Sequence, residues 1–179
     1  MYARITVSMA DTTYVNVLNR QGRVIDTKPR ADVDRRRDIL PAVYVFVKPS
    51  PGALLVATIP DDAYGARGTY VGKRGFPVAT FVRADEEPFA AAKRALQKDL
   101  AISVGDLTLL SQGYTVFSDG LRRHVWVYVV QHSGPFVADA FAASKLEIIT
   151  VEAVREECKA HPEQFAPSFI EFLPLLSDL

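Results

Sequence analysis

The sequence predicts an α+β protein in which a mixed β-sheet lies between helices, an α/β/α sandwich. Three observations predict this class: β-prone runs fill both halves of the chain, one long helix-period segment separates them, and helical segments follow the last strand. The strands come in groups and do not alternate singly with helices, which argues against a regular βαβ repeat. We expect residues 1–179 to form one domain.

The first elements expected are strands. Residues 14–19 and 23–28 are short β-prone runs around a turn that contains Gly22, which predicts an N-terminal hairpin over about 14–28. The charge cluster Asp-Val-Asp-Arg-Arg-Arg-Asp at 32–38 is typical of a solvated connection.

Two more apolar runs follow. Residues 42–47 and 54–58 flank Lys-Pro-Ser-Pro-Gly at 48–52, which predicts a second hairpin made of two central strands. Residues 60–74 are polar and rich in Asp and Gly, so we expect a mobile loop beside a site.

The strongest helix signal begins at Pro88, after an extended run at 76–82. Proline is well tolerated in the first helical turn, and the acidic residues at 85–87 lie at the favourable end of the helix dipole. The helix should end near Leu100. Its apolar stripe consists of Phe89, Ala92, Leu96 and Leu100.

The remaining elements are strands and then helices. Residues 107–117 and 122–131 flank Ser-Asp-Gly, a hairpin signal. A short strand is expected at 146–150. C-terminal helices are expected at 151–160 and 165–176, within a helical region of about 151–177.

Composition excludes several functions. Lys and Arg number 21, as do Asp and Glu, so the zero net charge disfavours general nucleic-acid binding. Apolar runs are too short for a transmembrane helix, and no secretory or transit signal is apparent, so we expect a cytoplasmic protein without membrane contact. The lone Cys158 excludes an internal disulfide.

The segment from Gly75 to Ile102 resembles a Nudix box, whose pattern is G-x5-E-x7-R-E-U-x-E-E-x-G-U with U a bulky aliphatic residue. With Arg94 on the arginine, Glu86 falls on the first glutamate, and Leu96 and Ile102 fall on the aliphatic positions. Pro88 stands where the family often has proline. The positions that depart from the pattern are Thr80 and Ala101 for the glycines, and Ala95, Lys98 and Asp99 for the later glutamates.

The order of the surrounding segments supports the resemblance. The hairpin, the strands before the box and the tail at 160–169, Ala-His-Pro-Glu-Gln-Phe-Ala-Pro-Ser-Phe, resemble the isopentenyl-diphosphate isomerase-like branch of the Nudix superfamily. The resemblance covers roughly residues 14–176. It implies the Nudix fold, with the box helix packed on a mixed sheet.

The departures change the chemistry that the resemblance implies. Positions 95, 98 and 99 share one helix face, and active family members carry glutamates there that hold Mg²⁺ against a diphosphate. Here Lys98 offsets Asp99, so we expect no metal ion, no cofactor and no ordinary Nudix hydrolysis. The remaining weak candidates for metal ligands are Asp85, Glu86, Glu87 and Asp99.

The sequence supports a binding hypothesis. Lys98, with Arg94, Lys73 and Arg74, would contact the phosphate of a phosphorylated or diphosphate small molecule in place of the metal. This describes a catalytically impaired Nudix protein with a degenerate box.

Three alternatives stay open. The basic residues are also compatible with a solvated helix edge in an interaction module, and a homodimer that uses the fold only as a scaffold is compatible with the sequence. In the third, the chain is a Mg²⁺- or Mn²⁺-dependent hydrolase of a nucleoside-diphosphate-type or isoprenoid-diphosphate-type substrate. Its catalytic candidates are Glu86 and Asp99, assisted by Asp61 or Asp62.

Overall fold

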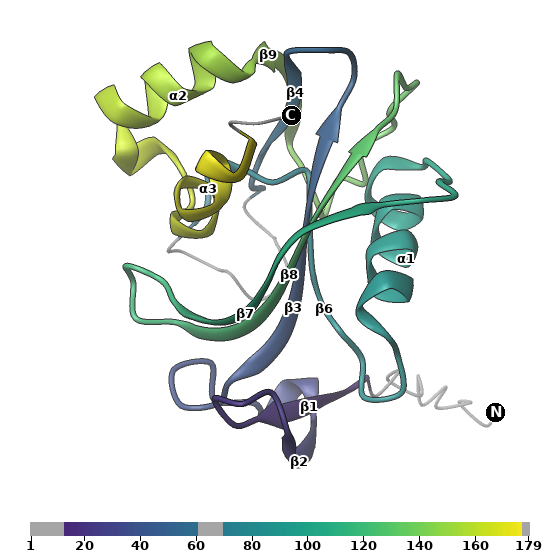
Figure 1. Cartoon of the computed structure of the whole chain (residues 1–179), viewed down its shortest axis with the longest axis vertical. Helices are drawn as coiled ribbons and strands as arrows, with labels where there is room; N and C mark the ends of the chain where they lie inside the picture. Colours follow the sequence, from purple (N-terminus) through teal and green to yellow (C-terminus); the bar gives the residue numbers. More distant parts are fainter. Residues whose placement is uncertain (1–12, 61–69, 177–179) are drawn as a thin grey trace, which may run out of the picture.

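The computed structural model describes residues 13–60 and 70–176 and places helices on both sides of the strands (Figure 1). The strands form three sheets with the orders β1-β2, β6-β3-β8-β7 and β5-β4-β9. The predicted α+β class with a mixed sheet between helices is confirmed. The strands are β1 (Tyr14–Leu18), β2 (Val24–Pro29), β3 (Leu40–Lys48), β4 (Ala53–Thr58), β5 (Arg74–Gly75), β6 (Val78–Phe81), β7 (Thr108–Val116), β8 (Arg122–Gln131) and β9 (Lys145–Thr150). The helices are α1 (Pro88–Leu100), α2 (Val151–Ala160) and α3 (Pro167–Phe172), with 3₁₀ turns at Arg30–Asp32, Pro162–Gln164 and Leu173–Leu176.

β3 lies inside the four-stranded sheet because both of its faces are apolar. It pairs antiparallel with β6 and parallel with β8, which makes this sheet mixed. Successive side chains of a strand point to opposite faces. Val43, Val45 and Val47 therefore pack with α1, whereas Tyr44 and Phe46 face the layer of α2 and α3. One strand thus contributes to two apolar cores.

The predicted hairpin of β3 and β4 is wrong in its pairing. Both strands form, but β4 pairs with β5 and β9 in a separate three-stranded sheet. A strand has two hydrogen-bonding edges, and those of β3 are taken by β6 and β8. The turn at 49–52 therefore carries the chain from one sheet to the other.

α1 confirms the helix expected from Pro88 to near Leu100. It packs on β3 and β6, and Pro88 occupies its first turn. The helix ends at Ala101, which adopts a left-handed backbone conformation with φ 56° and ψ 29°. The side chains that α1 buries are Ala91, Ala92, Ala95, Leu96, Asp99 and Leu100.

The N-terminal hairpin is confirmed as β1 and β2. Gly22 has a φ of 79°, a conformation that glycine adopts without steric cost, and its N–H donates to the carbonyl of Asn19 at 3.0 Å. Val15 and Val17 pack against Leu40 at the start of β3. These contacts attach the hairpin beneath the four-stranded sheet (Figure 1).

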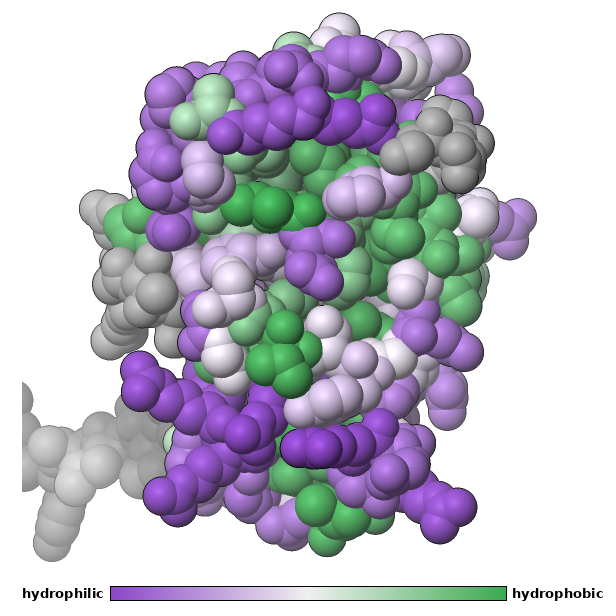
Figure 2. All heavy atoms as spheres, turned by 60° about the vertical axis from the view of Figure 1, so that its left-hand side comes forward, coloured by the Kyte–Doolittle hydropathy of each residue, from purple (hydrophilic) through white to green (hydrophobic). Residues whose placement is uncertain are grey.

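The C-terminal segment forms shorter helical elements than the sequence indicates. The helix expected at 165–176 is the short α3 followed by a 3₁₀ turn that contains Pro174. Ala166 donates its N–H to the Arg74 carbonyl at 2.9 Å, and Gly75 leaves room for the Ala166 side chain. Figure 2 shows apolar side chains gathered across the middle of this side of the molecule, between polar groups above and below. In the described ranges, no helix is long and apolar enough to cross a membrane.

Candidate functional site

A cleft of about 580 Å³ opens between the box helix and the C-terminal segment. Its walls come from β3, β6, α1, the β7–β8 turn and the start of α3. The residues that follow β2 close it near the N-terminal hairpin. This volume falls in the range of small-molecule sites.

The cleft is basic although the whole chain has no net charge. Among the described residues that line it, six are arginine or lysine and two are aspartate. Its apolar floor is formed by Tyr44, Phe76 and Phe117, whose rings contact one another at centroid distances of 5.1 and 6.1 Å around Tyr44. The arrangement suits an anionic ligand that also has an apolar or aromatic part.

Arg94 lies in this cleft, but it is paired within the protein. Its Nε and Nη2 donate to the two carboxylate oxygens of Glu86 at 2.6 and 2.7 Å, and Nη2 also donates to the Phe81 carbonyl at 3.3 Å. Burial works against ionisation of Glu86, yet the bonds from Arg94 and from the Arg83 N–H hold its pKa below the ordinary value. The pair joins α1 to the strand end that precedes it.

Asp99 is the acidic residue that α1 presents to the cleft. It is only 7% exposed, and burial raises its pKa to about 6; the charge of Asp139 acts in the same direction, while Lys98 and Arg94 oppose it. Lys98, the next residue back, is exposed and also lines the cleft. Ala95 completes this helix face and has no polar side-chain atom.

The other two basic residues expected at the site lie elsewhere. Arg74 forms ion pairs with Glu147 at 3.4 Å and with Glu157, and its guanidinium lies 5.0 Å from the centre of the Phe165 ring. These contacts tie β5 to β9 and α2. Neither Lys73 nor Arg74 lines the cleft. The structure therefore brings Arg94 and Lys98 together and separates them from the 73–74 pair.

The cleft contains four arginines that the sequence did not single out, one of which is Arg83 after β6. Arg30, Arg35 and Arg123 all line the cleft, on the side of the N-terminal hairpin. Arg35 belongs to the charge cluster at 32–38, which the sequence assigns to a solvated connection. Arg123 is 4% exposed in β8. It lies between Arg122 and His124 at the start of an otherwise apolar strand, and that position was the signal that the sequence offered.

Comparisons identify the fold. No family model matches the sequence, and no curated protein matches it. Among solved structures, DR0079 from Deinococcus radiodurans is similar to this chain, with 18% sequence identity and a TM-score of 0.72. The matched region covers 90% of this chain and 97% of DR0079. A MutT Nudix hydrolase from Burkholderia pseudomallei is 16% identical, with a TM-score of 0.61 and coverage of 77% and 98%. The Nudix domain of Shewanella oneidensis NrtR, solved in complex with ADP-ribose, is 13% identical, with a TM-score of 0.60 and coverage of 83% and 94%. The chain has the Nudix fold.

Nudix hydrolases typically use Mg²⁺ or Mn²⁺, and the donors on α1 and just before it do not fit such an ion. Glu86 is held by Arg94, Ala95 offers no oxygen, and Asp99 is buried beside the ammonium group of Lys98. Asp85 and Glu87 do not line the cleft. Asp61 and Asp62 lie outside the described residues. Within residues 13–60 and 70–176, no group of three or more His, Cys, Asp or Glu is placed to hold a metal ion.

Proposed function

We propose that this chain binds a phosphorylated or diphosphate-bearing small molecule in the cleft without a metal ion, as a catalytically impaired Nudix protein with a degenerate box. The excess of basic over acidic residues among the described cleft residues is the observation that carries the proposal. The Shewanella oneidensis Nudix domain was solved with ADP-ribose, a diphosphate compound, which supports a ligand of this class. Membership of the isomerase-like branch stays a prediction from the tail sequence.

Lys98 is the proposed phosphate contact on α1. A unit charge at about 4 Å, with an effective dielectric constant near 20, contributes about 4 kcal/mol of interaction. Where a carboxylate would attract a divalent cation, an ammonium group repels the cation and attracts the phosphate directly. Arg94 supports this contact from its pair with Glu86, because it fixes the start of the helix that presents Lys98.

A metal-dependent hydrolase is the alternative. It draws on Asp99, since a cleft carboxyl with a pKa of about 6 exchanges its proton near neutral pH. Such an enzyme would need metal ligands beyond those that α1 provides.

Thermal unfolding with ligands separates these functions. The purified chain is heated with ADP-ribose, an isoprenoid diphosphate or inorganic pyrophosphate, each with and without Mg²⁺ or Mn²⁺. A ligand at about 100 times its Kd stabilises the fold by about 2.7 kcal/mol, which raises Tm by roughly 5 to 10 °C for a domain of this size. We expect stabilisation by at least one diphosphate compound without metal.

Charge-reversal variants locate the contact. Lys98→Glu should abolish the stabilisation, whereas Lys93→Glu, which makes the same charge change on the same helix outside the cleft, should preserve it. Stabilisation that requires metal, accompanied by turnover, would replace the binding proposal with the hydrolase. A chain that no phosphate compound stabilises would contradict both and favour an interaction module.

A further inference from the structure

Three guanidinium groups surround one aromatic ring at the hairpin side of the cleft. The guanidinium carbons of Arg30, Arg35 and Arg123 lie 5.7, 5.7 and 5.4 Å from the centre of the Phe81 ring. The arginines come from the 3₁₀ turn after β2, from the following loop and from β8, and all three line the cleft. We call Arg30, Arg35 and Arg123 the arginine cluster.

Arg123 is the buried centre of the arginine cluster. Its Nη1 donates to the carbonyl oxygens of Arg122 at 2.6 Å and Arg35 at 3.4 Å. Within residues 13–60 and 70–176, no carboxylate forms an ion pair with Arg123. The charge of Asp119, which also lines the cleft, acts on Arg123 without forming an ion pair with it. Buried charges in proteins are normally paired directly, so this guanidinium calls for an anion.

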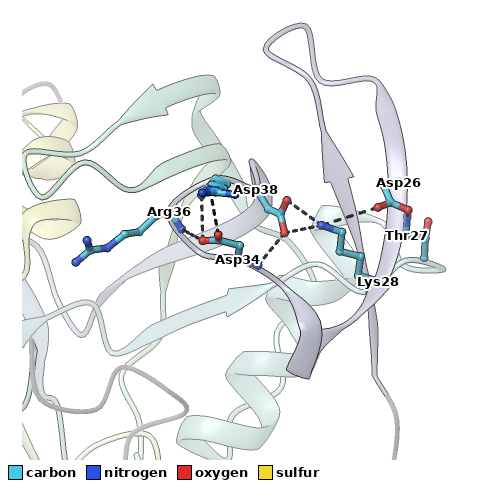
Figure 3. A network of polar contacts seen from close by, with 7 residues as sticks. Asp26, Thr27, Lys28, Asp34, Arg36 and Asp38 are labelled. Carbon is cyan, nitrogen blue, oxygen red and sulfur yellow. Dashed lines mark hydrogen bonds and ion pairs between the residues drawn. The ribbon is translucent and has the colours of Figure 1, made fainter.

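The acidic residues beside Arg35 in sequence are bound elsewhere. Both carboxylate oxygens of Asp38 accept hydrogen bonds from Lys28 Nζ at 3.0 Å, and one also accepts from the Asp34 N–H at 2.8 Å (Figure 3). The Asp34 carboxylate accepts from the Arg36 N–H at 3.0 Å. Lys28 of β2 and main-chain N–H groups of the loop therefore bind these two carboxylates. Arg35, from the same loop, lines the cleft.

Like charges within the arginine cluster repel one another. Burial, and then the charge of Arg123, lowers the pKa of Arg35, and burial lowers the pKa of Arg123. The face of the Phe81 ring attracts each cation by about 0.5 to 2 kcal/mol. A dianionic group at this place would relieve the repulsion and accept several charge-assisted hydrogen bonds.

We propose that the arginine cluster is a phosphate subsite, which takes a phosphoryl group of the ligand at the hairpin side of the cleft. The inference rests on the proposed function, because it assigns a second anchor within the same cleft. Phe81 connects the two anchors, since its ring lies among the arginines and its carbonyl accepts from Arg94 on the box helix. The ligand class is therefore a small molecule with a phosphate group that reaches away from Lys98.

Titration calorimetry with inorganic pyrophosphate, at constant ionic strength, tests this subsite on the full chain. Arg35→Gln is the main variant, because Arg35 is only half-buried and its replacement leaves the backbone contacts of the loop in place. Loss of one charge-assisted contact should weaken binding at least tenfold. Arg36→Gln is the matched control: it removes the same charge from the next residue, which is exposed and does not line the cleft, and should change Kd less than twofold.

Arg35→Lys keeps the charge without the planar fork, and we expect intermediate binding. Circular dichroism and Tm check that each variant is folded; if Arg35→Gln fails to fold, Arg30→Gln, also half-buried, takes its place. Equal weakening by Arg35→Gln and Arg36→Gln would overturn the subsite, because it would show a general effect of charge.

The two proposals fail in different ways. If Lys98→Glu weakens binding and Arg35→Gln does not, the subsite is wrong and the proposed function stands. If Arg35→Gln weakens binding and Lys98→Glu does not, the subsite is supported and the role of Lys98 is wrong. If the unmodified chain binds no pyrophosphate, the subsite is overturned. The proposed function is overturned as well if none of the other diphosphate compounds stabilises the chain.

Discussion

The two basic regions of the cleft differ in where their countercharges lie. On α1, Arg94 pairs in two hydrogen bonds with Glu86, which lies just before the helix, and Asp99 lies beside Lys98. Beside Arg35 of the arginine cluster, Asp34 and Asp38 are held by Arg37, by Lys28 and by main-chain N–H groups. The difference teaches that a count of charges along a sequence does not locate an anion site, because the fold decides which cations line the cleft.

The largest expected effect comes from breaking the pair on α1. Arg94→Ala leaves Glu86, whose side chain is 13% exposed, without its cation and removes a donor from the Phe81 carbonyl. We expect the free energy of unfolding to fall by about 2 to 3 kcal/mol in urea titrations. Lys93→Ala, an exposed change one residue earlier, should lower it by less than about 0.5 kcal/mol. Similar effects for the two variants would mean that Arg94 is not a structural cation.

Asp99→Asn should show a pH-dependent stabilisation. The pKa of Asp99 is raised to about 6 in the folded chain, so the fold binds this proton more tightly than the unfolded chain does. The resulting stability is fully present below about pH 4 and is lost as the pH rises through about 6. Asparagine resembles the protonated acid. The free energy of unfolding of the variant should therefore exceed that of the unmodified chain by about 2 kcal/mol at pH 7.5 and equal it near pH 4.

Urea unfolding across this pH range measures the difference. Asp106→Asn, an exposed change in the loop after α1, corrects for the altered net charge. A stability difference for Asp99→Asn that does not change with pH would contradict the expectation.

Ala101→Gly should stabilise the protein by about 0.5 to 1 kcal/mol. Ala101 ends α1 with a φ of 56°, which costs an alanine about 1 to 2 kcal/mol that glycine avoids, and the larger entropy of unfolded glycine offsets part of the gain. Ala90→Gly, at an exposed position within the helix, should have the opposite sign and a similar size. Thermal unfolding gives both values. A loss of stability in Ala101→Gly would show that the helix end is not strained.

The smallest effect expected is on binding. Asp38→Ala removes the contacts that hold the loop to Lys28, so Arg35 should be less well positioned. The pyrophosphate Kd should rise about two- to fivefold, because Asp38 acts on the ligand only through Arg35. Removal of a negative charge would by itself strengthen anion binding and lower Kd. A rise in Kd therefore indicates that Asp38 positions Arg35, whereas a fall indicates only the change in net charge. Asp32→Ala, at an exposed position in the same charge cluster, should leave Kd unchanged or slightly lower it. Tighter binding by Asp38→Ala in the same titration would rule out a positioning role.

Local patterns predicted the elements well because they depend on neighbours in sequence. The helix period and Pro88 located α1, and turn residues such as Gly22 located the first hairpin. The pairing of β3 with β8 depends on residues about 80 positions apart, which the periodicity of either strand does not report. The turn residues between β3 and β4 therefore predicted that these two strands pair with each other, although β3 pairs with β6 and β8.

The site was predictable only in part, for the same reason. Arg94 and Lys98 came from one helix, and both lie at the cleft. Arg74 is basic and near the box in sequence, but its acids, Glu147 and Glu157, come from the last third of the chain. Arg123 meets Arg35 only because β8 lies beside β3, whose first residues follow the loop.

The cleft takes its walls from both ends of the described chain. Val15 of β1 and Arg30 lie on one side, whereas Ala166, Pro167 and Ser168 at the start of α3 lie on another. During synthesis, where the N-terminal residues emerge first, β1 and Arg30 would precede the C-terminal wall by more than 100 residues. Docking of Ala166 on Gly75 is then the event that completes the cleft, so the proposed ligand cannot stabilise a growing chain whose hairpin has already formed. Binding of the proposed ligand would therefore stabilise only the completely folded chain.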